Sequence, residues 1–172
     1  LSDVELSGAF NSNQGSFDAP WIGMALAGSG DYIIDSSTIE STDSALKASG
    51  TGTLTITDST FISDRIGMSF SGISATTLDG VVVNISSDGE MGVDILQGSH
   101  TFTDLEVNMP YKQFATGSTG INAWWCDLIG GDVSVTGFAN SISVYEAVLN
   151  IDDLILLDSA KQGLYASSSM VS

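Results

Sequence analysis

The feature that most constrains this chain is a loose internal repeat of about two dozen residues. Six aspartates open successive copies at intervals of 23, 21, 25, 23 and 25 residues: Asp35, Asp58, Asp79, Asp104, Asp127 and Asp152. After each aspartate comes a short apolar run, and a polar turn then leads into a second run. Self-similarity at a fixed period of this length predicts a scaffold of stacked units.

The second half of each copy is also repeated. Its clearest examples, Trp21–Gly28, Arg65–Gly72 and Met91–Gly98, place a small residue beside apolar ones and a glycine at the exit. The period lengthens once, around Gly130-Gly131. We expect an enlarged loop at that point.

The apolar runs have the length and pattern of β-strands. Thr53–Thr57 alternates apolar with polar residues, whereas Val81–Val83 and Leu154–Leu157 are short continuous apolar runs of the kind found in buried strands. Strong helix formers are scarce, and nineteen glycines with many Ser, Thr, Asn and Asp residues can supply the turns. The sequence therefore predicts an all-β protein.

Short strands at this period favour a β-solenoid of about seven coils, each pointing alternate side chains into a central apolar column. The chain resembles the right-handed parallel β-helix (pectin-lyase-like) family in its Asp-initiated runs at 35–39, 58–62 and 79–83 and in its Ile-Gly-Met segments. The resemblance covers residues 20–170 and implies a secreted enzyme or a surface protein. A β-sandwich is the alternative fold.

The 172 residues, 42% of them apolar, predict one domain spanning 1–172, with a loop excursion over residues 8–20. Because the chain starts at Leu1 without Met, we expect a processed chain, a fragment of a longer one, or a subunit that pairs end to end. No stretch approaches the ~20 apolar residues of a membrane-spanning helix, so no membrane insertion is predicted within these residues.

Charge narrows the range of partners. Twenty-one acidic residues against four basic ones give a net charge of −17, which disfavours nucleic acid, anionic lipid and acidic polysaccharide. The acidic composition, rich in Gly, Ser and Thr, is typical of an extracellular or cell-surface protein. The single Cys126 cannot form an internal disulfide, and we expect a buried thiol in the core.

Calcium is the metal that this composition could bind, because Ca²⁺ prefers carboxylate and carbonyl oxygens. The candidate ligands form two groups that lie close in the predicted coils: Asp64, Asp88 and Glu90, and Asp132, Asp152 and Asp153. The alternative is that each aspartate bonds the amides of its own turn. Zinc is disfavoured, because one His and one Cys cannot fill its usual ligand shell.

No catalytic residue is assigned from the sequence. His100 lies in a segment that resembles a turn, where we expect it to face solvent, and the only Arg, Arg65, is expected to form a local ion pair with Asp64. A glycoside hydrolase needs two carboxylates on one face. Two groups are conceivable: Asp64, Asp88 and Asp94, and Asp127 and Asp132. Among sixteen aspartates, however, close pairs arise by chance.

Trp124 and Trp125 form an adjacent aromatic pair. Because consecutive strand residues face opposite sides, we expect one ring in the core and the other outside. The outward ring could lie under a loop, stack on a sugar or form a subunit interface, and Trp21 is a further interface candidate.

Together these patterns predict a noncatalytic structural protein that self-associates in an extracellular surface assembly, such as a surface layer, sheath, stalk or adhesin. A carbohydrate-active β-helix domain, either a polysaccharide hydrolase or a lyase, is the first alternative. A calcium-stabilised binding module is the second.

Overall fold

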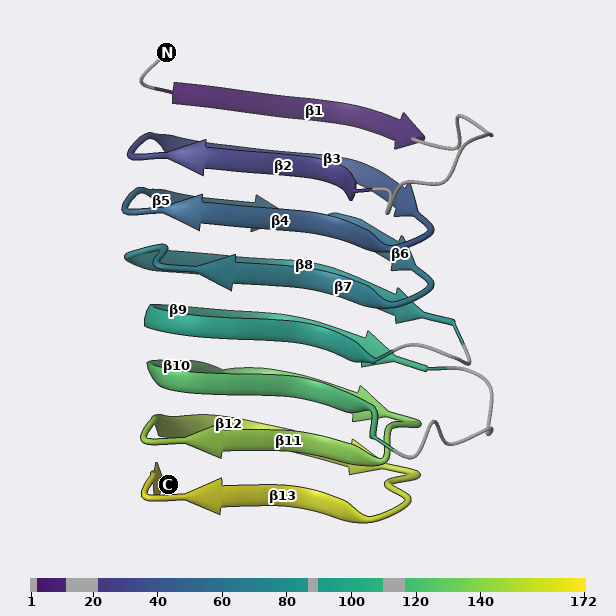
Figure 1. Ribbon diagram of the computed structural model, residues 1–172, viewed down its shortest axis with the longest axis vertical. Coiled ribbons are helices and arrows are strands. Elements are labelled where there is room, and N and C mark those ends of the chain that lie inside the picture. The colour runs from purple at the N-terminus through teal and green to yellow at the C-terminus, as the bar shows by residue number, and fades with distance from the viewer. Residues whose placement is uncertain (1–2, 12–21, 87–89, 110–116) are drawn as a thin grey trace.

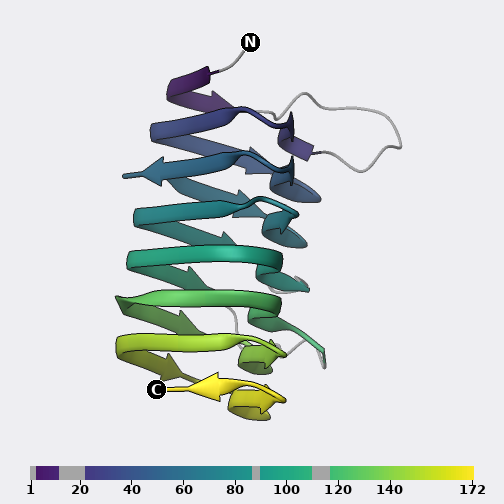
Figure 2. The same ribbon diagram turned by 90° about the vertical axis from the view of Figure 1, so that its left-hand side faces the viewer.

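The computed structural model describes residues 3–11, 22–86, 90–109 and 117–172, and it shows a stack of β-coils (Figures 1 and 2). Every element of the described residues is a strand. The strands are β1 (Asp3–Asn11), β2 (Ile22–Gly28), β3 (Asp31–Ser41), β4 (Ser44–Gly50), β5 (Thr53–Thr57), β6 (Thr60–Ser63), β7 (Ile66–Ser71), β8 (Ala75–Ile85), β9 (Met91–Asn108), β10 (Thr119–Thr136), β11 (Asn140–Tyr145), β12 (Val148–Leu157), β13 (Gln162–Ser167) and β14 (Met170–Val171).

The strand pairing confirms a parallel β-solenoid of about six turns, close to the seven expected. Each strand pairs in parallel with the equivalent strand one turn away, so β3 follows β1, and β9 lies between β8 and β10. The β-sandwich alternative is wrong, because a sandwich is built from antiparallel strands. We call each turn a layer and each line of register-paired residues a column.

Each layer has three faces joined by sharp corners. The first face is formed by β2, β4, β7, the first parts of β9 and β10, β11 and β13. The other two faces are formed by β1, β3, β5, β6, β8, the second parts of β9 and β10, β12 and β14. At the first corner one residue per layer has positive φ: Gly28, Gly50, Gly72, Gln97, Trp125, Glu146 and Ser168. A second such column joins the other two faces: Ser36, Asp58, Gly80, Asp104, Asp132 and Asp153.

The aspartates that open the repeats are distributed over several columns. Asp35, Asp79 and Asp152 share one column, in which Thr57, Thr103 and Gly131 alternate with them. Asp58 and Asp104 lie instead in the second corner column, and Asp127 pairs with Ser99 and Val148. The unequal repeat lengths thus shift most of these like charges out of register. Asp104, Asp132 and Asp153 do succeed one another in the second corner column, where all three are exposed and solvent screens their repulsion.

Hydroxyl groups occupy the places between these carboxylates. Thr57 Oγ1 donates to Asp35 Oδ1 in the layer before it, and Thr53 Oγ1 donates to Asp31 Oδ1 at 2.6 Å. A hydrogen bond from a neutral hydroxyl stabilises a carboxylate without adding a second charge. The alternation of Asp and Thr is therefore compatible with layers stacked in register.

Two sequence-based expectations about loops are wrong. Gly130 and Gly131 lie inside β10, where a Cβ on Gly130 would lie 1.9 Å from the carbonyl oxygen of Phe102, so this glycine permits close stacking. The long interval falls one layer earlier, where Met91 pairs with Thr119.

Residues 8–11, expected to begin a loop excursion, belong to β1, whose Phe10 pairs in register with Ile39 of β3. The remainder of that expected excursion, residues 12–20, lies outside the described residues.

A column of small residues on the first face explains the Ile-Gly-Met repeat. Its members are Gly23, Ala45, Gly67, Gly92, Gly120, Ser141 and Gly163. A Cβ on Gly92 would lie 2.2 Å from Cγ1 of Val107 and 2.5 Å from the carbonyl oxygen of Gly120. The branched side chain from the opposite face fills the space that a larger residue would need, so the interior is closely packed at this level.

We predict that Gly92→Ala destabilises the fold by about 1–3 kcal/mol, because the added methyl group collides with a buried side chain and with backbone. Gly117→Ala is the matched control, since a Cβ there meets no atom within 4 Å. Urea unfolding followed by circular dichroism measures both variants. Equal stabilities would contradict this explanation of the glycine column.

Candidate functional site

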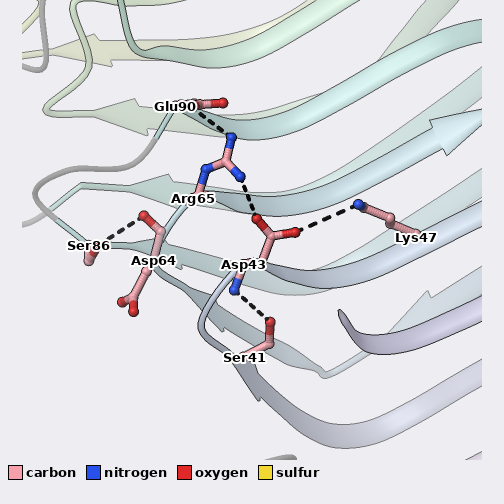
Figure 3. Close-up of polar contacts among 7 residues, drawn as sticks. All are labelled: Ser41, Asp43, Lys47, Asp64, Arg65, Ser86 and Glu90. Atoms are coloured by element: carbon pink, nitrogen blue, oxygen red, sulfur yellow. Dashed lines mark hydrogen bonds and ion pairs between the residues drawn. The ribbon is translucent and has the colours of Figure 1, made fainter. Parts of the chain in front are cut away.

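The chain's only arginine joins three successive layers at one corner (Figure 3). Arg65 Nη1 donates to Asp43 Oδ1 at 2.7 Å, and Nη2 donates to Glu90 Oε1 at 2.9 Å. Lys47 Nζ lies 3.8 Å from the other oxygen of Asp43, whose side chain is almost fully buried. Hydrogen bonding to Glu90, followed by the two negative charges, raises the pKa of Arg65 above its usual value.

The expected pairing of Arg65 with Asp64 is wrong, because Arg65 binds Asp43 and Glu90 instead. The Asp64 carboxylate points away from the guanidinium in Figure 3, and its backbone carbonyl accepts a hydrogen bond from Ser86 Oγ at 3.1 Å. Arg65 pairs with residues of the adjacent layers and not with its neighbour in sequence. Residues at equivalent positions of successive layers lie side by side, whereas the side chains of consecutive residues point in different directions. The arrangement is a structural clamp between layers.

The five predicted calcium ligands that the structure describes fall at two separate corners. Glu90 forms an ion pair with Arg65, and Asp64 directly precedes Arg65 in the sequence. Asp88 lies outside the described residues. Asp132 and Asp153 are successive members of the second corner column, and Asp152 pairs with Gly131. No group of three or more His, Cys, Asp or Glu side chains that could hold a metal occurs among the described residues.

His100 is buried, which corrects the expectation of a solvent-facing turn. It is 1% exposed within β9, in the inward column that contains Leu54 and Leu128, and its ring stacks on Phe70 at 6.2 Å. Its Nε2 lies 3.0 Å from the carbonyl oxygen of Gln97, and Nδ1 has no hydrogen-bond partner among the described residues. Burial lowers the pKa of His100, opposed by the Gln97 carbonyl and by the charge of Asp127.

A pH dependence follows from this burial. Because the folded-state pKa lies below the unfolded value of about 6.5, the unfolded chain takes up a proton first as the pH falls. We predict that stability is fully present above pH 6.5 and is lost below it, with a slope of at most about 1.4 kcal/mol per pH unit from this residue.

His100→Leu, which copies Leu128 in the following layer, should remove this slope between pH 6.5 and 5. Urea unfolding across that range tests it. A slope that is unchanged in the variant would assign the pH dependence to other groups.

Cys126 is a buried free thiol, as expected from the sequence. Burial, with the nearby charge of Asp127, raises the pKa of Cys126 to about 12. A thiol so weakly ionised at neutral pH is a poor nucleophile and a poor metal ligand. Cys126 therefore serves as a small core residue.

Neither tryptophan of the adjacent pair enters the core. Trp124 lies on the outer side of the first face and stacks on Tyr145 of the next layer, with ring centroids 4.0 Å apart and an angle of 13° between the planes. Tyr145 in turn lies 5.4 Å from Tyr165, which continues what we call the aromatic stack: Trp124, Tyr145 and Tyr165. Trp125 is 51% exposed at the first corner.

The expected alternation fails here because the corner interrupts the strand pattern. Trp125 has φ of 53°, so its side chain does not follow the in-and-out alternation of an extended strand. Its Nε1 donates to Glu146 Oε2 at 2.9 Å, and its ring meets Trp124 in a T-shaped contact at 5.8 Å. Trp21, the third predicted interface residue, lies outside the described residues.

An open hollow of about 600 Å³ lies beside Trp125, and we call it the corner hollow. It is lined by Gly98, Trp125, Cys126, Asp127, Glu146, Ala147, Val148, Ser168 and Met170. Sequence reasoning singled out Trp125, Cys126 and Asp127, and Gly98 as an exit glycine, but did not predict that they form one site. The lining residues become neighbours only through the register of four layers. The floor of small residues, Gly98, Cys126 and Ala147, is visible in the sequence only once that register is known.

Comparison of the chain with models of protein families, with curated proteins and with solved structures gives no match. Within the described part of the chain, no helix is long and apolar enough to span a membrane.

Proposed function

We propose that this chain is a noncatalytic structural protein that self-associates in an extracellular surface assembly, of the type of a surface layer, sheath, stalk or adhesin. We further infer that its relationship is with surface proteins of the right-handed parallel β-helix type. The acidic composition and the scarcity of basic residues support an extracellular location.

The observation that carries the proposal is a change of side-chain type on outward columns. In the layers before β12, the two columns that end in Ile155 and Leu157 are mostly polar, and the members directly above are Ser134 and Thr136. In β12 the same positions carry aliphatic side chains that are 51% and 52% exposed. Neither the core nor the corners require this substitution.

The aromatic stack shows the same change, from small or polar to large apolar side chains, on the outer side of the first face. The column of Trp124 and Tyr145 carries Ala27, Ser49 and Ser71 in the first layers, and the large apolar residues begin with the exposed Leu96 in β9. The column of Tyr165 carries small or polar residues above it: Ala25, Lys47, Ser69, Asp94, Asn122 and Ser143. Apolar side chains gathered on outward columns of neighbouring layers are typical of a surface that contacts another protein.

We predict that the wild-type chain forms oligomers or fibres whose size rises with concentration and with salt, since salt screens the repulsion between copies of charge −17. Ile155→Ser with Leu157→Thr, which copies the layer above, should shift the protein toward the monomer by about tenfold or more in association constant.

Sedimentation velocity, with and without a chelator, measures this association. Ile129→Thr is the matched control, because Ile129 is 48% exposed and its register partner above is Thr101, yet it lies on a different face of the stack from Ile155 and Leu157. A wild-type chain that stays monomeric at every concentration and salt level would contradict self-association. Oligomers that dissociate only with chelator would favour the calcium-stabilised alternative.

A further inference from the structure

The corner hollow owes its depth to residue size at one column of the stack. Gly98, Cys126 and Ala147 succeed one another there, so three layers present short side chains at the same height. Larger side chains stand on the adjoining columns: Trp125 on one side, Val148 and Met170 on the other. The result is a groove that runs along the stack axis, with a floor of small residues and walls in which these apolar side chains alternate with Asp127, Glu146 and Ser168.

Trp125 is held in a conformation that exposes it beside this groove. Its corner column begins with Gly28, Gly50 and Gly72, residues that adopt positive φ without cost, whereas Trp125 adopts a φ of 53° with a bulky side chain. The hydrogen bond to Glu146 and the T-shaped contact with Trp124 fix the indole ring. Gln97, Glu146 and Ser168 of this column also have positive φ, so the backbone conformation belongs to the corner itself. What distinguishes Trp125 is an exposed indole ring held in a fixed orientation, a feature typical of contact surfaces.

The charges that line the groove are all of one sign. Asp127 and Glu146 are exposed carboxylates, and the lining contains no Lys, Arg or His. The potential of a chain with net charge −17 adds to theirs. Anions are therefore repelled from the groove, and a cation is attracted to it.

We propose that the corner hollow binds an organic cation, an alkylammonium group whose carbon chain lies against Trp125 and Met170 and whose charge is held by Asp127 and Glu146. A cation near an indole face gains electrostatic attraction to the ring in addition to its ion pairs. The side chains of Trp125, Val148 and Met170 accommodate the alkyl part, which a metal ion lacks. The site is open, so the complex is weak, with a dissociation constant in the millimolar range.

Neutral sugar is the competing ligand class, since aromatic rings also stack on sugars. The aromatic stack offers sugars little, because Trp124 and Tyr145 cover each other's faces at 4.0 Å. At Trp125 the carboxylates of Asp127 and Glu146 can form ion pairs with a cation, which a neutral ligand cannot do. The charge on the ligand is thus the property that separates the two classes.

The test is titration of the 172-residue chain with n-butylammonium chloride at low salt, following the indole N–H of Trp125 by ¹⁵N NMR. This signal is assigned by its loss in Trp125→Gly, a substitution that the corner tolerates because glycine occupies the same position in three other layers. We expect a saturable shift with n-butylammonium and none with n-butanol at equal concentration. A peptide containing one lysine and a free amine such as spermidine are then compared, to separate a protein partner from a small molecule.

Variants locate the site. Asp127→Asn with Glu146→Gln should weaken n-butylammonium binding at least about fivefold. Asp104→Asn with Glu106→Gln is the matched control, because it removes the same charge from exposed positions outside the groove and should leave binding unchanged. Equal weakening by both pairs, equal shifts with n-butanol, or shifts with a neutral oligosaccharide but not with the amine would overturn the proposal. The result of this binding test does not depend on whether the chain self-associates.

Discussion

Parallel stacking of one layer on the next, in register, is the constraint on which the rest of this structure depends. Backbone hydrogen bonds hold successive strands about 4.8 Å apart, so every residue meets its equivalents at that distance. Each residue must therefore be compatible with the register partners that lie directly above and below it. Apolar residues meet this requirement by forming the core. Carboxylates are mostly shifted out of register or separated by hydroxyl groups, as Thr57 separates Asp35 from Asp79, and the three that do succeed one another, Asp104, Asp132 and Asp153, lie at an exposed corner.

The same constraint explains the glycines and the clamp at Arg65. Where two faces approach closely, as at Gly92, there is no room for a Cβ atom and the column carries small residues. Where charge is unavoidable, Asp43, Arg65 and Glu90 alternate in sign along the stack. The outward columns escape these limits, and there the layers from β10 onward depart from earlier ones by carrying Trp124, Tyr145, Ile155 and Leu157.

Much of the fold could be predicted from the sequence, because strand pattern and period are local properties that a stacked scaffold repeats. Register could not, since repeat lengths of 21 to 28 residues leave the pairing of each aspartate ambiguous. The corners were missed for a related reason. Trp125 and Asp58 adopt positive φ, which ordinary alternation does not anticipate, and His100 looked like a turn residue although its column is apolar. The corner hollow exists only through that register.

The central claim, in-register parallel stacking, is tested most directly by cysteine pairs placed across layers. Thr55 and Thr77 are register partners in adjacent layers, whereas Thr55 and Thr101 lie two layers apart. The distance between adjacent layers suits a disulfide, and twice that distance does not. The account predicts that Thr55→Cys with Thr77→Cys forms an intramolecular disulfide under mild oxidation, detected by mass spectrometry of the monomer, while Thr55→Cys with Thr101→Cys does not. Crosslinking of the second pair, or failure of the first in the folded protein, would contradict it.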